Sequence, residues 1–487
     1  SKLNLSFLYF KLNAHEKAEI IITEAIKLNP NLPNGYCIKG LILKSLNKYD
    51  QARLSLEKAI EIDPTYFDAY INLGLIYKDS NRYDQAEKYY LKALDINNKS
   101  AIAHLNLGAC YKEQQRIEKA ILHTKKAIEL DQKLENAYLN LATIYKQNGD
   151  YKKSLSLAKK ELIFNQNSEL SYQLISELIK RKELLNIPAK ENRFLIRNIL
   201  NRKDISHREL FGNLNNLISN DLLQKLSIVK SELYVNKDFN ILIEDKELVK
   251  ALSLLLFCSP KWEKALVNIR KNIIMKYSDK ENINNNILDF IIGLGSQCFL
   301  NEYVYYISLE EKNKLNELKK TINKSKNLDY KLAIISCYQS LYSINKELIN
   351  MNNYRSKNKQ FNDLFNLQYK ELNVEKNISN NIKNIGNIQD SISKKVKNQY
   401  ELNPYPRWRY NSYTHENKIN VLSIVNSETY PISIESNSID LENKIINILI
   451  AGCGTGIQIL EASRYSNCEI TAIDLSNSSI SYAKRKV

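Results

Sequence analysis

The chain has few of the residues that form tight turns. Its 487 residues include 12 glycines and 8 prolines, together with only 2 methionines and 2 tryptophans. Because glycine and proline interrupt helices, their scarcity favours a mainly helical chain. No apolar stretch approaches the ~18 residues of a membrane-spanning helix, so we predict no membrane partner.

Cysteine and histidine are also sparse. No two cysteines form a C-x-x-C pair, and no group of histidines accompanies them, so the sequence supports neither a zinc site nor a disulfide framework. We therefore predict reduced thiols, no bound metal and a cytoplasmic location. The seven cysteines lie at positions 37, 110, 258, 298, 337, 453 and 468.

The net charge of +16 raises the question of nucleic-acid binding. However, the lysines are spread along predicted solvent-facing surfaces. The sequence has no run of five or six like charges and no basic stripe interleaved with aromatic residues. We predict an ordinary solvated surface and no nucleic-acid partner. Hydrophobic residues make up 44% of the chain, which is enough for a sizeable core.

A 34-residue repeat dominates the first third of the chain. Gly40, Gly74 and Gly108 are each 34 residues apart, and Ala142 continues the series. This pattern resembles the tetratricopeptide repeat, a hairpin of two helices that touch at small residues. We predict about five such repeats over residues 1–168, the first of them partial. Further small residues recur with the same period, at Ala52, Ala86 and Ala120, and at Ala59, Ala93 and Ala127.

Stacked hairpins of this kind form a superhelix whose concave groove is lined by the first helix of each repeat. Asn72, Asn106 and Asn140 share one repeat position in that helix, whereas Ile38 interrupts the series. An amide is both donor and acceptor, so such a row suits the backbone of an extended peptide. The resemblance implies a peptide or protein partner that binds there. The alternative is a row of solvated asparagines.

Residues 169–395 lose the 34-residue period but keep helical periodicity, so we predict an all-helical connector. Its most apolar segment, 297–305, is expected to be a buried helix core, with an approach of Glu302 to the following domain as the alternative. Prolines 404 and 406 break the helical pattern. They predict an extended arm over residues 399–408.

The C-terminal part, residues 396–487, contains the one segment with a chemical pattern. An apolar run over 446–450 leads into a glycine-rich turn, and a second apolar run over 469–473 ends at Asp474. This order predicts a strand, a turn whose bare backbone a ligand can touch, a helix and a second strand. A carboxylate at the tip of the second strand would accept hydrogen bonds from a ribose. The turn consists of Ala451, Gly452, Cys453, Gly454, Thr455 and Gly456.

The spacing of the glycines bears on which cofactor the turn would bind. Dinucleotide sites carry G-x-G-x-x-G, whereas this turn carries G-x-G-x-G. The closer spacing resembles the first motif of class I S-adenosylmethionine-dependent methyltransferases. That resemblance implies S-adenosylmethionine as cofactor, held by the turn and by Asp474. An NAD-dependent oxidoreductase and a turn without a ligand are the alternatives. We expect Cys453 to be a small packing residue rather than a nucleophile.

Taken together, the repeats, the stretch 298–303, the arm residues 405–408 and the turn resemble a group of bacterial proteins. These are tetratricopeptide-repeat proteins with a C-terminal class I methyltransferase domain. The resemblance implies a mainly α chain, with a superhelix and a helical connector followed by the start of a Rossmann-like α/β domain. In many methyltransferases a segment before the first strand covers the cofactor, so Arg407 or a neighbouring aromatic residue (Tyr400, Tyr405 or Trp408) is expected to form a lid. A structural brace is the alternative.

The favoured function is therefore an S-adenosylmethionine-dependent methyltransferase whose repeats recruit a peptide or protein. The alternative is a non-enzymatic adaptor with a vestigial cofactor domain. The sequence starts inside a repeat and stops in the helix after the second strand, so we expect it to be part of a longer protein. Substrate groups and any general base would lie on later strands. We therefore assign no catalytic residue, and we expect this chain alone to be inactive.

Overall fold

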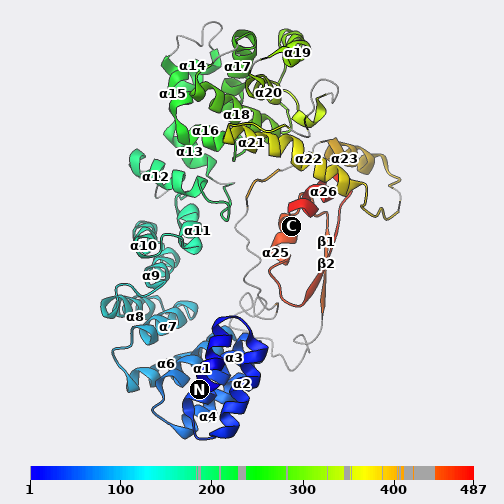
Figure 1. Cartoon of the computed structure of the whole chain (residues 1–487). Coiled ribbons are helices and arrows are strands. Elements are labelled where there is room, and N and C mark those ends of the chain that lie inside the picture. The colour runs from blue at the N-terminus through cyan, green and yellow to red at the C-terminus, as the bar shows by residue number, and fades with distance from the viewer. Residues whose placement is uncertain are drawn as a thin grey trace. The chain divides into compact units, whose positions relative to one another are not determined.

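A computed structural model shows a mainly helical chain with two short strands near its C-terminus (Figure 1). It describes residues 2–181, 184, 188–207, 210–228, 237–280, 283–325, 327–344, 351, 354–386, 388–402, 404, 407–410, 421 and 445–486. The described residues form two compact units, one running to Leu178 and the other beginning at Ile179. The first ten residues of the expected connector, 169–178, lie in the first unit, whereas the rest of the connector and the glycine turn lie in the second.

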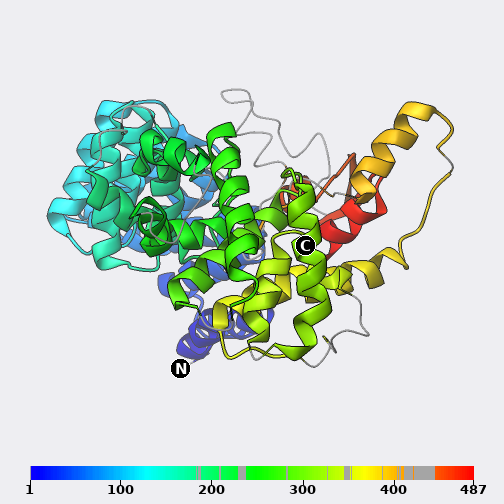
Figure 2. The same cartoon turned by 90° about the horizontal axis from the view of Figure 1, so that it is seen from above.

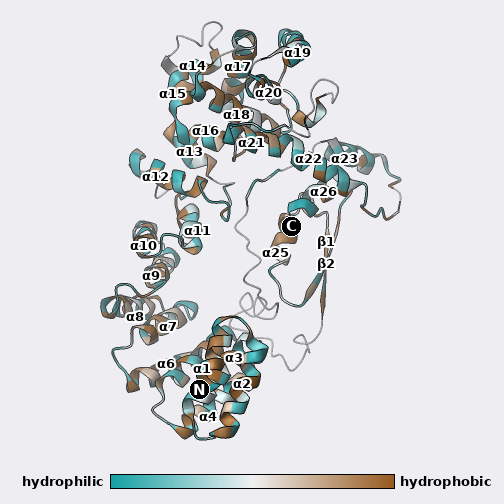
Figure 3. Cartoon of the chain, in the orientation of Figure 1, coloured by the Kyte–Doolittle hydropathy of each residue, from teal (hydrophilic) through white to brown (hydrophobic). Residues whose placement is uncertain are grey.

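The first unit is a series of five helix pairs followed by one further helix, which confirms the tetratricopeptide-type superhelix. Neighbouring helices pack in chain order, as expected of stacked hairpins. In Figure 3, the hydropathy changes from brown to teal around these helices, so each has an apolar side to bury. The helices are α1 (Lys2–Lys11), α2 (His15–Leu28), α3 (Pro33–Ser45), α4 (Tyr49–Ile62), α5 (Phe67–Asp79), α6 (Tyr83–Ile96), α7 (Ala101–Glu113), α8 (Ile117–Leu130), α9 (Ala137–Gln147), α10 (Tyr151–Phe164) and α11 (Glu169–Leu178).

The repeated glycines lie where the two helices of a hairpin touch. A Cβ atom added to Gly40 would lie 2.7 Å from Leu56 Cγ. At Gly74 it would lie 2.4 Å from Tyr90 Cε1. The larger partner therefore lies within the same repeat, sixteen residues after the glycine, and a side chain at the glycine would overlap it. In the fifth repeat, where Ala142 replaces glycine, the residue sixteen positions later is the small Ala158.

The turn between the helices of each pair has a left-handed backbone at one recurring position. Its φ values run from 57° at Asn13 to 80° at Gly149. Asparagine and glycine tolerate this conformation better than other residues do, which explains why they dominate the series. This second 34-residue signal is also visible in the sequence. The five positions are Asn13, Asn47, Asn81, Gln115 and Gly149.

The second unit begins with a helical array around α17 and α18. Trp262 of α17 and Phe290 of α18 are fully buried. Residues 297–300 complete α18 and are buried, and Tyr305 is buried as well, but Val304 is largely exposed, so the expected buried helix covers only part of 297–305. The helices are α12 (Ala189–Leu200), α13 (Phe211–Leu217), α14 (Asn220–Ile228), α15 (Lys237–Glu244), α16 (Lys246–Leu252), α17 (Pro260–Tyr277), α18 (Asn285–Leu300), α19 (Leu309–Thr321), α20 (Leu328–Ser336), α21 (Lys359–Phe365), α22 (Glu371–Ser379) and α23 (Ser391–Leu402).

Helix α23 differs from the expectation for the arm. The extended arm was expected to begin at residue 399, but α23 continues to Leu402. The first proline is Pro404, and a proline restricts only the residue directly before it. Residues 399–402 therefore stay helical, and the arm is shorter than predicted.

Two parallel strands lie near the C-terminus. β1 (Ile446–Ala451) pairs with β2 (Cys468–Ile473), with Ile446 opposite Cys468 and Ala451 opposite Ile473. Helix α25 (Ile457–Ala462) connects them, and α26 (Asn477–Lys486) follows β2. Helices α22 and α23 pack against α26, which Figures 1 and 2 show as neighbouring yellow-orange and red helices.

Candidate functional site

The predicted asparagine row lies on the first helices of three successive repeats. Asn72, Asn106 and Asn140 are on α5, α7 and α9, and all three are partly exposed. The Asn72 side-chain amide donates only to the weak acceptor Cys37 Sγ, at 3.4 Å. In the described part of the chain, no hydrogen bond involves the side-chain amides of Asn106 and Asn140. The row can therefore hydrogen-bond to an external backbone.

A row of lysines on the first helices of four repeats, α3, α5, α7 and α9, was not predicted from the sequence. Lys44 pairs with Asp79 at 2.7 Å, Lys112 with Glu113 at 2.7 Å and Lys146 with Glu177 at 2.9 Å. Because three of the four lysines pair with carboxylates, the row makes the surface polar rather than strongly basic. The sequence contains the signal for this row, because its lysines recur every 34 residues. The row comprises Lys44, Lys78, Lys112 and Lys146.

The glycine turn connects β1 to α25. Gly452, Gly454 and Gly456 all have positive φ, at 69°, 51° and 91°. The amides of Gly452 and Cys453 both donate to the Ile473 carbonyl, at 2.8 and 3.1 Å, so the turn is held against the end of β2. Only glycine adopts three such conformations in five residues at little cost.

The three glycines differ in how much space surrounds them, and this difference suggests different roles. A Cβ atom added at Gly452 or Gly454 would meet no described atom within 4 Å, so the backbone there is open to a ligand. At Gly456 the same atom would lie 2.6 Å from the Cβ of Ala483 in α26. The first two glycines therefore fit the approach of a cofactor, whereas the third allows α26 to pack closely.

Asp474 follows β2 and faces the turn. Its Oδ2 accepts from the Gly454 amide at 2.8 Å, and its Oδ1 accepts from the Ser476 amide at 2.9 Å. A carboxylate oxygen can accept more than one hydrogen bond, so acceptor capacity remains for a ribose hydroxyl. The carboxylate and the two open glycines together form an arrangement that fits an adenosyl group.

The remaining turn residues differ in exposure. Ala451 is exposed, whereas Cys453 and Thr455 are buried. Burial, with the nearby Asp474 carboxylate, raises the pKa of the Cys453 thiol to about 11. A thiol that stays protonated at neutral pH is a poor nucleophile.

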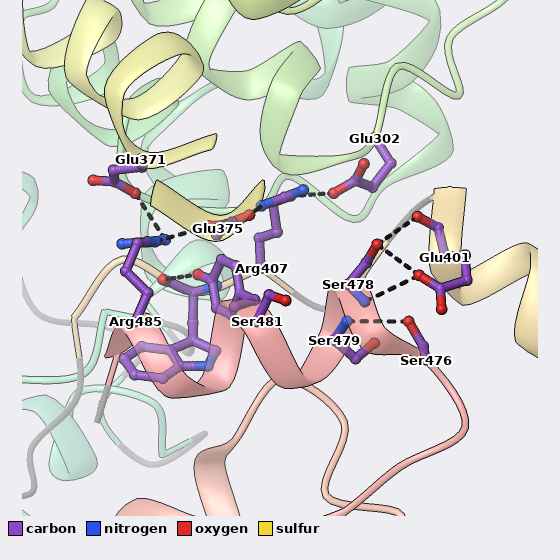
Figure 4. A network of polar contacts seen from close by, with 12 residues as sticks. Glu302, Glu371, Glu375, Glu401, Arg407, Ser476, Ser478, Ser479, Ser481 and Arg485 are labelled. Atoms are coloured by element: carbon purple, nitrogen blue, oxygen red, sulfur yellow. Dashed lines mark hydrogen bonds and ion pairs between the residues drawn. The ribbon is translucent and has the colours of Figure 1, made fainter. Parts of the chain in front are cut away.

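Arg407 lies in a buried group of ion pairs rather than at the glycine turn (Figure 4). Its guanidinium pairs with Glu302, at the end of α18, and with Glu375 of α22. Arg485 of α26 extends the group, 2.8 Å from Glu375 and 2.9 Å from Glu371. We call these five residues the buried ion cluster. Two carboxylates already bind Arg407, so this arrangement does not favour its pairing with a cofactor carboxylate. That pairing stays a prediction.

Trp408 is the arm residue that reaches the turn. Its indole Nε1 donates to the Thr455 carbonyl at 3.1 Å, and its backbone amide donates to the Tyr482 hydroxyl at 2.9 Å. Of the other expected lid residues, Tyr400 is 39% exposed on α23 and Tyr405 lies outside the described residues. Helix α25 has only six residues, so its dipole adds little at the turn.

Glu401 of α23 caps α26, which was not foreseen from the sequence. Its carboxylate accepts from the amides of Asn477 and Ser478, at 2.8 and 3.0 Å, as Figure 4 shows for Ser478. A carboxylate at these amides satisfies donors that a helix start leaves open. Helix α23 is thereby fastened to α26.

The described residues lack two other kinds of feature. These residues contain no group of three or more histidine, cysteine, aspartate or glutamate side chains placed to hold a metal ion. Nor does the described part of the chain contain a helix of the length and apolarity required to cross a membrane.

Comparison with protein-family models agrees with the repeat structure. A TPR repeat model matches residues 40–80, and tetratricopeptide repeat models match residues 65–133 and residues 1–32 with 135–160. None of the curated proteins compared with the chain matches it. The first third of the chain therefore carries tetratricopeptide repeats.

Several solved structures are also similar to part of the chain. PilF of Pseudomonas aeruginosa is 17% identical, with 40% of this chain and 89% of that chain covered and a TM-score of 0.36. TTC0263 of Thermus thermophilus, a thermophilic TPR protein, is 22% identical, with coverages of 37% and 97% and a TM-score of 0.33. YrrB, described as a TPR protein with an unusual peptide-binding site, is 20% identical, with coverages of 35% and 88% and a TM-score of 0.29.

Proposed function

We propose that the chain is an adaptor that holds an extended segment of a partner protein on the first helices of its tetratricopeptide repeats. The observation that carries this proposal is the partly exposed row of Asn72, Asn106 and Asn140. Each amide can accept from a peptide N–H and donate to a peptide carbonyl. Contacts of this kind bind the backbone, so they accept many sequences and leave specificity to neighbouring side chains.

The experiment starts from peptides selected for binding to the full chain in a displayed peptide library. For the tightest peptide, the Asn72→Ala/Asn106→Ala variant is expected to raise Kd by about tenfold or more. Each lost backbone hydrogen bond is worth on the order of 1 kcal/mol. Binding is measured by fluorescence anisotropy of the labelled peptide.

A matched control removes two other amides from the same repeats. Gln51 and Gln85 are exposed, share one repeat position and lie on the second helices, α4 and α6. The Gln51→Ala/Gln85→Ala variant should bind like the unmodified chain. Equal affinity in the asparagine variant, or an equal loss in both variants, would contradict peptide capture by this row.

We also propose that the glycine turn binds S-adenosylmethionine, as the start of a methyltransferase domain. This second function is supported by one observation, the open backbone of Gly452 and Gly454 beside the Asp474 carboxylate. When bound, the cofactor supplies an activated methyl group. The chain would hold the ribose through Asp474, let the turn backbone lie against the ligand and shield it with Trp408. Orientation of the two reactants and exclusion of water are what such a reaction needs from a protein.

Calorimetric titration with S-adenosylmethionine and with its demethylated product tests this second proposal. Saturable binding is expected, and Asp474→Ala should weaken it at least tenfold by removing the acceptor for the ribose hydroxyls. Glu469→Ala, an exposed carboxylate on the same strand, is the control and should leave binding unchanged. If a nicotinamide dinucleotide binds and S-adenosylmethionine does not, the oxidoreductase alternative replaces it. Binding of neither leaves the adaptor function alone.

A further inference from the structure

A cavity of about 720 Å³ in the second unit lies apart from the turn residues and the asparagine row. Helices α12, α15, α16, α18 and α21 contribute its walls, and Arg409 and Tyr410, directly after the arm, also line it. Pockets of roughly 300–1,000 Å³ are the size that holds small-molecule ligands. We call it the basic cavity because cationic side chains line it.

The lining of the basic cavity is strongly positive. Two carboxylates, Asp289 and Asp363, face six cationic side chains. Burial raises the pKa of the Asp289 carboxyl above its ordinary value. The six cations are Arg202, Lys203, Lys246, Lys250, Lys359 and Arg409.

Among the described residues, most of these cations have no carboxylate partner. Arg202 pairs with Asp204 outside the lining, and Lys250 donates to the Asn201 amide oxygen. In the part of the chain that the structure describes, no salt bridge engages Lys203, Lys246 or Lys359. The charge of the cavity is therefore available to a ligand.

Arg409 also has a guanidinium nitrogen without a hydrogen-bond partner among the described residues. This atom, Nη1, is buried. A buried donor without a partner costs free energy, which an anionic acceptor in the cavity would recover. Guanidinium groups bind phosphate oxygens in paired hydrogen bonds, so Arg409 is suited to such a ligand.

Lys250 and Lys359 lie close enough to repel each other. Burial, and then the Lys359 ammonium, lower the pKa of Lys250, while the Asp363 carboxylate acts in the opposite direction. An anion between the two ammonium groups would turn this repulsion into attraction. The two lysines therefore point to a place for negative charge on α16 and α21.

We propose that the basic cavity binds a small molecule bearing several phosphate groups. The cavity volume, the excess of unpaired cations and the unsatisfied Arg409 guanidinium together carry this inference. A nucleic-acid strand fits less well, because strand-binding grooves stack bases on rows of aromatic side chains. The basic cavity has one aromatic residue, Tyr410. The proposal does not depend on the glycine turn binding a cofactor.

Inorganic tripolyphosphate is the probe for this proposal, titrated calorimetrically into the full chain at moderate ionic strength. Saturable binding is expected, and it should weaken as salt rises, as charge-driven binding does. The Lys250→Glu/Lys359→Glu variant should lose at least tenfold in affinity. Tryptophan fluorescence shows whether charge reversal unfolds the second unit. If it does, the Lys250→Gln/Lys359→Gln variant is tested in its place.

The control reverses two exposed lysines that do not line the cavity. Lys264→Glu/Lys312→Glu changes the net charge equally and should keep full affinity. Absence of tripolyphosphate binding, or an equal loss in both charge-reversal variants, would overturn the proposal. So would a short single-stranded oligonucleotide that binds more than tenfold tighter and needs the same lysines, since the cavity would then serve nucleic acid.

Discussion

His207 shows how burial sets the chemistry of a single residue. Its side chain is 2% exposed between α12 and α13, and its Nε2 lies 2.9 Å from the Ile199 carbonyl. Burial lowers the pKa of His207 from 6.5 to about 4. The folded chain therefore holds this imidazole neutral at physiological pH, with its ring edge-on to Tyr410.

The lowered pKa of His207 predicts a loss of stability in acid. The unfolded chain takes up a proton near pH 6.5, but the folded chain does so only near pH 4, so stability falls as pH drops between these values. The total loss from this group is about 3 kcal/mol. It should appear in urea unfolding followed by tryptophan fluorescence, since both tryptophans, Trp262 and Trp408, lie in the second unit.

His207→Gln should remove this part of the acid sensitivity, because glutamine keeps an amide donor but does not titrate. His15→Gln is the control and should leave the curve unchanged, since His15 lies in the first unit. An acid slope that survives in His207→Gln would show that other groups cause it.

His104 and His123 show that spacing along the chain does not predict which side chains face each other. They are nineteen residues apart, on α7 and α8. In the structure their Nδ1 atoms are 3.0 Å apart. Repeat spacing identifies which helix a residue belongs to, but the facing of two side chains depends on how those helices pack.

At the scale of the element, the hairpins depend on matched sizes across the two helices. Gly74 and Tyr90 fit each other, whereas Ala142 comes with Ala158 at the corresponding positions. The period alone identified the small residue. It did not show that the large residue sixteen positions later packs within the same hairpin, because that depends on the crossing of the helices.

Gly74→Ala should destabilise the first unit by about 1–3 kcal/mol, since the added methyl group meets the fully buried Tyr90 ring. The same substitution in a Tyr90→Ala background should cost much less, because the obstacle is gone. Urea unfolding followed by circular dichroism measures both values. Gly212→Ala, where nothing lies within 4 Å, is the control. Equal costs in the two backgrounds would exclude the steric explanation.

At the scale of the whole second unit, the buried ion cluster joins segments that are distant in sequence. Arg407 of the arm pairs with Glu302, just after α18, and with Glu375 of α22, and Glu375 also pairs with Arg485 of α26 (Figure 4). Burial raises the pKa of Glu302 despite the attraction of Arg407. The cluster therefore serves as a brace in this structure, which is the alternative role considered for the arm.

Arg407→Gln should destabilise the second unit by roughly 3–5 kcal/mol near pH 8, because it leaves buried carboxylates without their cation. The loss should shrink as pH falls, since Glu302 in the variant takes up a proton more readily in the folded than in the unfolded chain. Tryptophan fluorescence during urea unfolding measures this. Lys271→Gln, which breaks the exposed pair with Glu310, should cost under about 1 kcal/mol. A loss for Arg407→Gln no larger than this control would refute the brace.

Features that depend on local spacing could be predicted from the order of residues alone. The 34-residue period placed the repeats, and the succession of apolar runs, glycines and acid placed the turn and Asp474. Such patterns follow from which residues share a helix face or end a strand. Helix packing was needed to show that Arg407 pairs with Glu302, that Trp408 reaches the turn and that cations from several helices and from the residues directly after the arm surround one cavity. These residues are many positions apart, and their meeting depends on how whole helices pack.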